Sequence, residues 1–277
     1  MKKTLFKAFS ALALAGAFGS SAFAAQITIT ADSDYRSGGG GEFNVRAADA
    51  SGEALLAPSL ALGYTIVNGT TLGTANGTRM NPGFNSQVGF ETFCIEYNES
   101  ITIGGTYSAS ISLGSIYGGV AGGVDPDGAG PLPTTDLISV GTAFLYNSFA
   151  KGTLSGYTYA NGTSRAASAA KLQEAFWFLE DEITLTAAQI TANAFLQAAF
   201  TAFGTPGAGI GDLAGGAKKN NTIFNVAVLN LGGAAPNQKQ DQLILNDNHF
   251  AVPDGGTTAA LMGLSLTGLA LLRRKKA

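Results

Sequence analysis

Short runs in which apolar and polar residues alternate fill the first part of the chain, from Gln26 to about Gly114. Alternation with a period of two is typical of strands that have one buried face, and clusters of Gly, Asn and Pro separate these runs. Asn68-Gly69 and Asn76-Gly77 are dipeptides that favour tight hairpin turns. We therefore predict an antiparallel β region. Its strands are expected in QITITA, EFNVRAA, LGYTIV, QVGFETFCIEYNE and TYSASISLG.

The hydrophobic period changes to that of helices over about residues 136–204. Apolar residues three or four apart predict a first helix over 136–150, which stops at Gly152. The strand-like run GYTYA follows. A second helix is then predicted over 165–182, with Ser164 as its N-cap.

A third helix is predicted from Thr186 to about Gly204, because Thr186 and Gln189 have the spacing of a capping box. Beyond a glycine-rich loop, TIFNVAVLNL and QDQLILND are the apolar runs of two closing strands. The predicted class is α+β and mainly β. We expect an antiparallel β-sandwich or barrel in which a three-helix insertion precedes the final hairpin.

The N-terminus has the three parts of a secretory signal peptide. Two lysines give a basic start, residues 8–18 form an apolar stretch that suits a helix, and Ala22 and Ala24 fit a small-x-small cleavage site. We predict that signal peptidase removes residues 1–24 as the chain is exported.

A second membrane-directed pattern lies at residues 250–277. Residues 257–272 carry no charge, and as a helix they would extend about 24 Å, which is short for a permanent transmembrane anchor. Positive charge stays on the cytoplasmic side, so the cations that follow orient the preceding domain outward. They are Arg273, Arg274, Lys275 and Lys276. The pattern predicts a transmembrane helix, held in the inner membrane either transiently or as a plain single-pass anchor.

The residues before that helix carry a family resemblance. The order of a Pro-containing motif, an apolar helix and a basic cluster resembles the C-terminal sorting signals of PEP-CTERM proteins, in the variant written VPDSG. The motif here is Val252, Pro253, Asp254, Gly255 and Gly256, and it departs from the variant at Gly255, where the family has Ser. The resemblance implies processing by an exosortase and delivery to the cell surface, envelope or exopolysaccharide matrix.

Composition limits what the exported domain, residues 25–249, is expected to bind. Between Ala25 and Asp254 the chain has nine basic and 19 acidic residues, a net charge of −10. This balance excludes a typical nucleic-acid binder. Cys94 is the only cysteine, so no intramolecular disulfide can form. His249 is the only histidine and lies just before the C-terminal segment, so a histidine-dependent catalytic or metal site in the domain is not expected. We expect no metal, no cofactor and no enzymatic activity.

Cys94 and Gln173 are the pair that could carry chemistry. Alternation along the strand places Cys94 on a mixed face with Glu96, and puts Phe93, Ile95 and Tyr97 on the apolar one. The second predicted helix places Gln173 and Trp177 four residues apart on one stripe.

If the thiolate of Cys94 met the carboxamide of Gln173, it could expel ammonia and leave an internal thioester. Such a bond needs an apolar shield against hydrolysis, and we expect Phe176 and Trp177 to supply it.

These residues resemble the thioester domains of bacterial surface adhesins, which place the cysteine between bulky apolar residues and the glutamine in a motif written TQxAIW. Phe93-Cys94-Ile95 and Gln173-Glu174-Ala175-Phe176-Trp177 resemble this pattern, with departures at Leu172, where the family has Thr, and at Phe176, where it has Ile. The resemblance implies covalent attachment to an extracellular polysaccharide or surface protein. A Cys/Gln contact without a bond and plain core packing stay open as alternatives.

Two further patterns receive structural interpretations. The run Gly38–Gly41 lacks the context of a dinucleotide fingerprint and is predicted to be a flexible loop. Carboxylate pairs such as Glu91 with Glu96 allow glycan hydrolysis in principle, and the charges at Glu180, Asp181 and Glu182 are more typical of a solvated face. The leading hypothesis is an exported surface or matrix protein, with a non-reactive structural component as the alternative.

Overall fold

The computed structural model describes residues 24–30, 36–37, 40–64, 66–67, 70–71, 89–116, 135–160, 162–232 and 238–247. The predicted signal helix, the Asn68-Gly69 and Asn76-Gly77 turns, His249 and the whole sorting signal lie outside these residues. No helix within the described ranges is long and apolar enough to cross a membrane.

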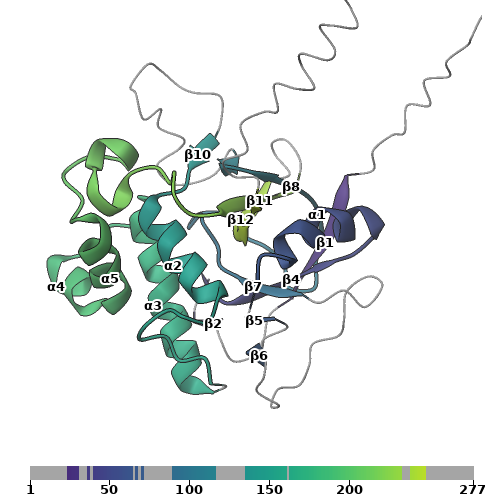
Figure 1. Ribbon diagram of the computed structural model, residues 1–277, viewed down its shortest axis with the longest axis horizontal. Coiled ribbons are helices and arrows are strands. Elements are labelled where there is room, and N and C mark those ends of the chain that lie inside the picture. The colour runs from purple at the N-terminus through teal and green to yellow at the C-terminus, as the bar shows by residue number, and fades with distance from the viewer. Residues whose placement is uncertain are drawn as a thin grey trace, which may run out of the picture.

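An eight-stranded antiparallel sheet forms the centre of the molecule, in the order β12-β11-β8-β1-β4-β7-β5-β6 (Figure 1). Two small ribbons accompany it, β2 with β3 and β9 with β10. The strands are β1 (Ala25–Thr30), β2 (Arg36–Ser37), β3 (Gly40–Gly41), β4 (Phe43–Ala47), β5 (Ile66–Val67), β6 (Thr70–Thr71), β7 (Phe90–Thr92), β8 (Thr106–Ser112), β9 (Gly114–Ile116), β10 (Thr135–Leu137), β11 (Val226–Gly232) and β12 (Gln238–Leu245).

The sheet closes on itself into a nearly complete barrel. Beyond the end of β7, the N–H of Leu243 donates to the carbonyl of Phe93, and the N–H of Ile95 donates to the carbonyl of Asp241, each at 3.1 Å. Cys94 lies between these two bonds and forms an isolated antiparallel bridge with β12. The last strand thereby meets the chain just beyond β7, so of the two predicted architectures the sheet approaches the barrel.

The alternation read from the sequence sets the burial of the strands. Ile27 and Ile29 of β1 are fully buried while Thr28 between them is half-buried. Residues 226–229 of β11 are all fully buried, because β11 has a neighbouring strand on each side and α2 packs against it. The core therefore lies between the strands and the inserted helices.

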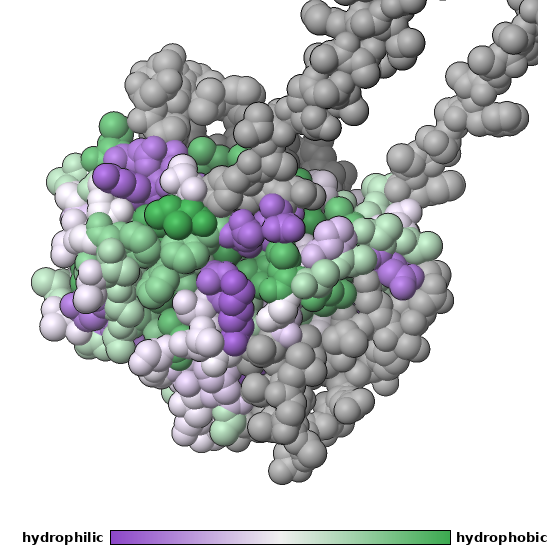
Figure 2. Space-filling view, in the orientation of Figure 1, coloured by the Kyte–Doolittle hydropathy of each residue, from purple (hydrophilic) through white to green (hydrophobic). Residues whose placement is uncertain are grey.

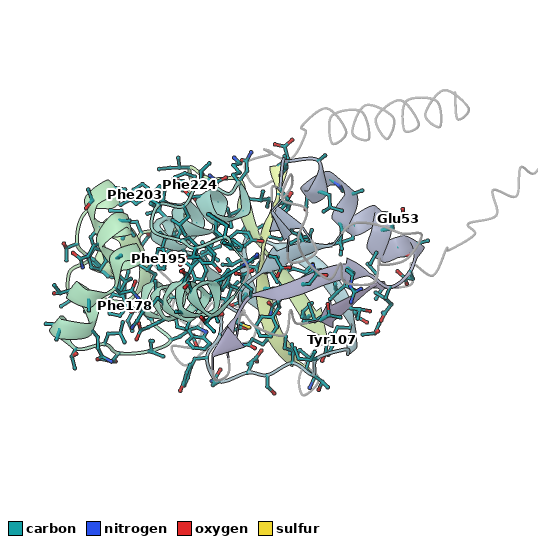
Figure 3. All side chains as sticks on the ribbon, turned by 90° about the horizontal axis from the view of Figure 1, so that it is seen from below. Glu53, Tyr107, Phe178, Phe195, Phe203 and Phe224 are labelled. Carbon is teal, nitrogen blue, oxygen red and sulfur yellow. The ribbon has the colours of Figure 1, made fainter. Side chains whose placement is uncertain are left out.

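The inserted helices lie together on one side of the strands, and α1 lies on the other (Figure 1). The helices are α1 (Ala50–Leu60), α2 (Val140–Ala150), α3 (Thr163–Leu179), α4 (Ala187–Ala192) and α5 (Ala194–Phe203), with short 3-10 turns η2 (Gly211–Ala214) and η3 (Gly216–Lys218). Figure 3 shows Phe178, Phe195, Phe203 and Phe224 on the helical side, and Tyr107 on the opposite side of the strands.

Helix α1 was not predicted, because residues 50–60 lie in the region assigned to strands. Its start is set by Asp49, whose carboxylate accepts a hydrogen bond from the N–H of Gly52 at 2.6 Å. Pro58 and several small residues weaken its hydrophobic period, so the cap is the main local indication of a helix.

The first two inserted helices differ from the prediction at their ends. Helix α2 begins at Val140, because residues 135–137 pair as β10 and Ser139 supplies the N-cap. The predicted N-cap at Ser164 was wrong: α3 begins after Gly162, whose φ of 130° suits glycine, and no side chain caps it. The GYTYA run is not a strand, and its two tyrosines pack against Phe149.

The capping box of Thr186 and Gln189 is confirmed, but the helix that it opens is divided. Asn193 has an extended ψ of 102°, and its side chain accepts hydrogen bonds from the N–H groups of Phe195 and Leu196. Because Asn193 ends α4 and caps α5, the predicted third helix becomes two, and the insertion contains four helices within the described residues.

On the face shown in Figure 2, apolar side chains gather over the helical part, and hydrophilic side chains form separate patches among and beside them. This mixed surface accords with the composition of the chain, in which only 13 per cent of the residues are charged.

Candidate functional site

The carboxamide of Gln173 occupies a gap between two strands. β4 and β7 pair with Phe43 opposite Thr92, and the same register continued by two residues would place Gly41 opposite Cys94. The Gln173 side chain lies there instead. Its Oε1 accepts from the N–H of Cys94 at 3.1 Å and of Gly41 at 3.3 Å, and its Nε2 donates to the Cys94 carbonyl at 2.8 Å. The structure thus brings together the two residues that the sequence paired.

Helix α3 presents two different groups from neighbouring stripes. Phe176 is fully buried and packs edge to face on Phe93, with ring centroids 5.2 Å apart. Trp177 is half-buried, its indole N–H donates to the carbonyl of Glu96 at 3.2 Å, and its ring packs against Tyr97 at 4.9 Å. Trp177 therefore covers the site from the surface, whereas Phe176 belongs to the core beneath it.

Gly40 allows β3 to approach α3 closely. A Cβ atom at this position would lie 2.5 Å from Cγ of Gln173 and 2.6 Å from Cη2 of Trp177, closer than real Cβ contacts allow. Gly40 and Gly41 are buried strand residues, so the prediction of a flexible loop was wrong for both. Glycine is needed here because backbone, glutamine and indole meet at one point.

A fully buried ion pair fastens this segment to α3. The guanidinium of Arg165 donates to Oε1 of Glu42 at 2.9 Å and to Oε2 at 2.6 Å, and the Tyr157 hydroxyl also donates to Oε1. Burial alone would lower the pKa of Arg165, but the hydrogen bonds and charge of Glu42 raise it. Because Glu42 directly follows Gly41, the ion pair fixes the backbone that contacts Gln173.

The thiol of Cys94 has no exposed surface and contacts a second glutamine. Nε2 of Gln242, the residue opposite Cys94 on β12, lies 3.4 Å from Sγ. Burial raises the pKa of the thiol well above its usual range, and the hydrogen bond from Gln242 opposes that effect. Sequence reasoning missed Gln242. The only local indication was its place in a strand-like run, Gln240-Asp241-Gln242, close to the end of the chain.

The residues that follow Cys94 do not alternate as predicted. Tyr97, which was expected on the apolar face, is 56% exposed, whereas Glu96 on the mixed face is buried. The strand ends before them, so their orientation follows individual contacts: Oε2 of Glu96 accepts from the N–H of Asp241 at 2.7 Å. Burial, followed by the charge of Asp241, raises the pKa of Glu96 to about 9.

A pocket at the end of α3 contains further acidic groups. The expectation of a solvated face was wrong here, because Glu180 and Glu182 are buried. Glu180 accepts from the N–H of Ser139 at 3.1 and 3.3 Å, and burial with the charge of Asp136 raises its pKa to about 7. The pocket is lined by Asp136, Leu137, Ser139, Leu179, Glu180, Asp181, Ile210, Gly211, Lys218 and Asn220. Within the described ranges no group of three or more His, Cys, Asp or Glu residues is placed to hold a metal ion.

Comparison with known proteins bears on the C-terminal segment. No curated protein and no solved structure matches the chain. The assignment of the candidate site therefore depends on the geometry of its residues alone. Residues 251–276 match the family model described as the VPDSG-CTERM motif, which supports a PEP-CTERM-type sorting signal of an exported protein.

Proposed function

We propose that the mature protein is an exported component of the cell surface or extracellular matrix, and that it attaches covalently through a thioester between Cys94 and Gln173. The first part is supported by the sorting motif at residues 251–276, which is consistent with export and with processing by an exosortase. The second part rests on the geometry around Gln173.

The observation that carries the thioester proposal is the pair of backbone donors on Oε1 of Gln173. The N–H groups of Cys94 and Gly41 converge on this oxygen from two different strands. Two such donors polarise a carbonyl and stabilise the negative charge that its oxygen gains when a nucleophile attacks the carbon. An ordinary buried glutamine needs only satisfied hydrogen bonds, whereas this one has an arrangement suited to acyl transfer.

The reaction needs only the two side chains. Cys94 Sγ attacks Cδ of Gln173, the bond from Cδ to Nε2 breaks, and the thiol proton leaves with the nitrogen as ammonia. In the structure Nε2 is held by the carbonyl of Cys94 at 2.8 Å, a hydrogen bond that is given up as the product forms. A target amine or hydroxyl then replaces the sulfur and remains attached to the former glutamine.

The cover over the site is consistent with a protected acyl bond. Cys94 is fully buried, and the half-buried ring of Trp177 packs against the exposed ring of Tyr97. Such a cover slows hydrolysis and must be displaced or entered by the target. The net charge of −10 between Ala25 and Asp254 favours a neutral or basic target, such as the lysine amines of a surface protein or the hydroxyls of a polysaccharide.

A non-reactive structural component is the second candidate, and specific observations favour it. Every polar atom of the Gln173 carboxamide has a backbone partner, as a purely structural residue would have. The raised pKa of the Cys94 thiol also reduces the fraction of thiolate available for attack. In this case the carboxamide of Gln173 would form the backbone hydrogen bonds that Gly41 and Cys94 do not form with each other.

Intact-mass measurement of the purified exported protein separates the two candidates. The thioester predicts a deficit of about 17 Da relative to the sequence mass, lost on treatment with methylamine, which adds its own mass. Cys94→Ala and Gln173→Ala should remove the deficit, whereas Gln197→Ala, at an exposed position of α5, should keep it. A wild-type mass equal to that of the sequence, with a thiol that reacts after unfolding, would rule out the thioester and support the structural role.

Processing of the sorting signal is tested separately. If an exosortase acts at the motif, Pro253→Ala should retain the C-terminal segment and leave the protein with the inner membrane in cell fractionation. Unchanged release of the Pro253→Ala protein would favour an anchor that is independent of the motif.

A further inference from the structure

We propose that Gln242 is the hydrogen-bond donor that stabilises the Cys94 sulfur when the thioester opens. This inference deepens the proposed function and rests on it. It assigns a role to a residue that lies on the last strand of the barrel, far in sequence from both members of the pair.

The position of Gln242 follows from the closure of the barrel. It lies directly opposite Cys94 in an antiparallel bridge, and residues paired in this way project their side chains on the same face. Nε2 of Gln242 is 3.4 Å from Sγ and 3.0 Å from the carbonyl oxygen of Gln240. An amide nitrogen has two hydrogens, so one can serve the carbonyl while the other points to sulfur.

The backbone contact fixes the orientation of this amide. The carbonyl of Gln240 can only accept, so it bonds the nitrogen of the Gln242 carboxamide, and this nitrogen lies closer to Sγ, at 3.4 Å, than the amide oxygen, at 4.0 Å. The side chain is fully buried, so water does not compete for the same hydrogens. The donor is in place before any reaction begins.

The chemistry of opening requires such a donor. An amine attacks Cδ of Gln173, the bond from Cδ to Sγ breaks, and the electron pair stays on sulfur. The proton lost by the amine finally resides on Sγ, which restores the Cys94 thiol. Between these steps the sulfur carries negative charge in a site without exposed surface, where an unsolvated thiolate is unfavourable.

The two halves of the reaction thus have separate donors. The N–H groups of Cys94 and Gly41 stabilise charge on the oxygen of Gln173, and the N–H of Gln242 stabilises charge on the sulfur. Removal of the sulfur donor should slow opening without changing which atoms react. Hydrogen bonds to charged groups are worth about 1.5–3 kcal/mol, which corresponds to a roughly 10- to 150-fold lower rate.

The test is the rate at which methylamine removes the mass deficit of the full exported protein. Gln242→Met keeps the length of the side chain and removes the donor, and we expect opening to slow at least about tenfold. Asn230→Leu is the matched control, because Asn230 is a buried amide on β11 whose Nδ2 bonds Ser112 and the carbonyl of Val228. It should open at the wild-type rate.

Gln242→Glu provides a second variant with a readout that a structural role would not change. A protonated carboxyl can donate to sulfur, whereas an ionised one repels it, so the ratio of variant to wild-type rate should fall as the pH rises. If both Gln242 variants show the mass deficit, open at the wild-type rate and keep a rate ratio that does not change with pH, the role of Gln242 is overturned and the thioester stands. Absence of the deficit from the wild-type protein would overturn both the thioester and this inference.

Discussion

Arg165→Met is the substitution that most directly tests how the candidate site is held. It removes the guanidinium but keeps an apolar side chain, so Glu42 stays fully buried and keeps the hydrogen bond from the Tyr157 hydroxyl without the neighbouring positive charge. Loss of one member of a buried pair typically costs roughly 3–5 kcal/mol, because the remaining charge loses its compensation. This is a third or more of the stability of many domains.

The cost should appear in urea unfolding followed by the fluorescence of Trp177, the only tryptophan of the chain. Lys171→Met is the matched control: it breaks a pair with Glu174 in which the lysine is 53% exposed, and it should cost less than about 1 kcal/mol. Replacing both Glu42 and Arg165 by apolar residues should recover much of the lost stability. Equal costs for the buried and the exposed pair would refute the assignment of Arg165 as the anchor of this segment.

Three further predictions concern other parts of the molecule. Gly40→Ala should displace Gln173, destabilise the protein by about 1–3 kcal/mol in urea unfolding and reduce the mass deficit; unchanged values would show that the contact yields. Because the folded state keeps a proton on Glu96 that the unfolded state releases, stability should decrease as pH rises from about 4.5 towards 9, by up to about 1.4 kcal/mol per pH unit. Glu96→Gln should flatten this dependence in thermal melts, and an equally steep curve would contradict it. Asn193→Ala should cost about 1–2 kcal/mol of stability, because two N–H groups of α5 lose their cap; a loss of a few tenths would mean that water replaces it.

The elements that could be predicted are those specified by local pattern. The strands β1, β4 and β8 follow from alternation, and β11 and β12 follow from apolar runs. Thr186 with Gln189 forms its capping box because three residues of spacing suffice. Local pattern fails where a single capping residue sets the end of a helix and the residues around it indicate a different structure. Asn193 divides a continuous apolar stretch into α4 and α5, and Asp49 begins a helix in a sequence otherwise poor in helical period.

The candidate site was only partly predictable for a related reason. Gln173 and Cys94 could be paired because each belongs to a short pattern, and the structure places their hydrogen-bonding groups in contact. Glu42, Arg165 and Gln242 are polar residues whose burial depends on segments more than a hundred residues away. In sequence such residues resemble the solvent-facing positions of a strand or helix, and only the folded structure shows that they are buried.

The most direct test of the central claim is to find the bond in peptides. Trypsin should release residues 80–151, which contain Cys94, and residues 172–218, which contain Gln173, since neither range has an internal lysine or arginine. After digestion of the exported protein at mildly acidic pH, the thioester predicts one species in which the two peptides are joined, lighter than their sum by about 17 Da and separated by methylamine. Two separate peptides at their full masses, from protein never exposed to an amine, would contradict the account.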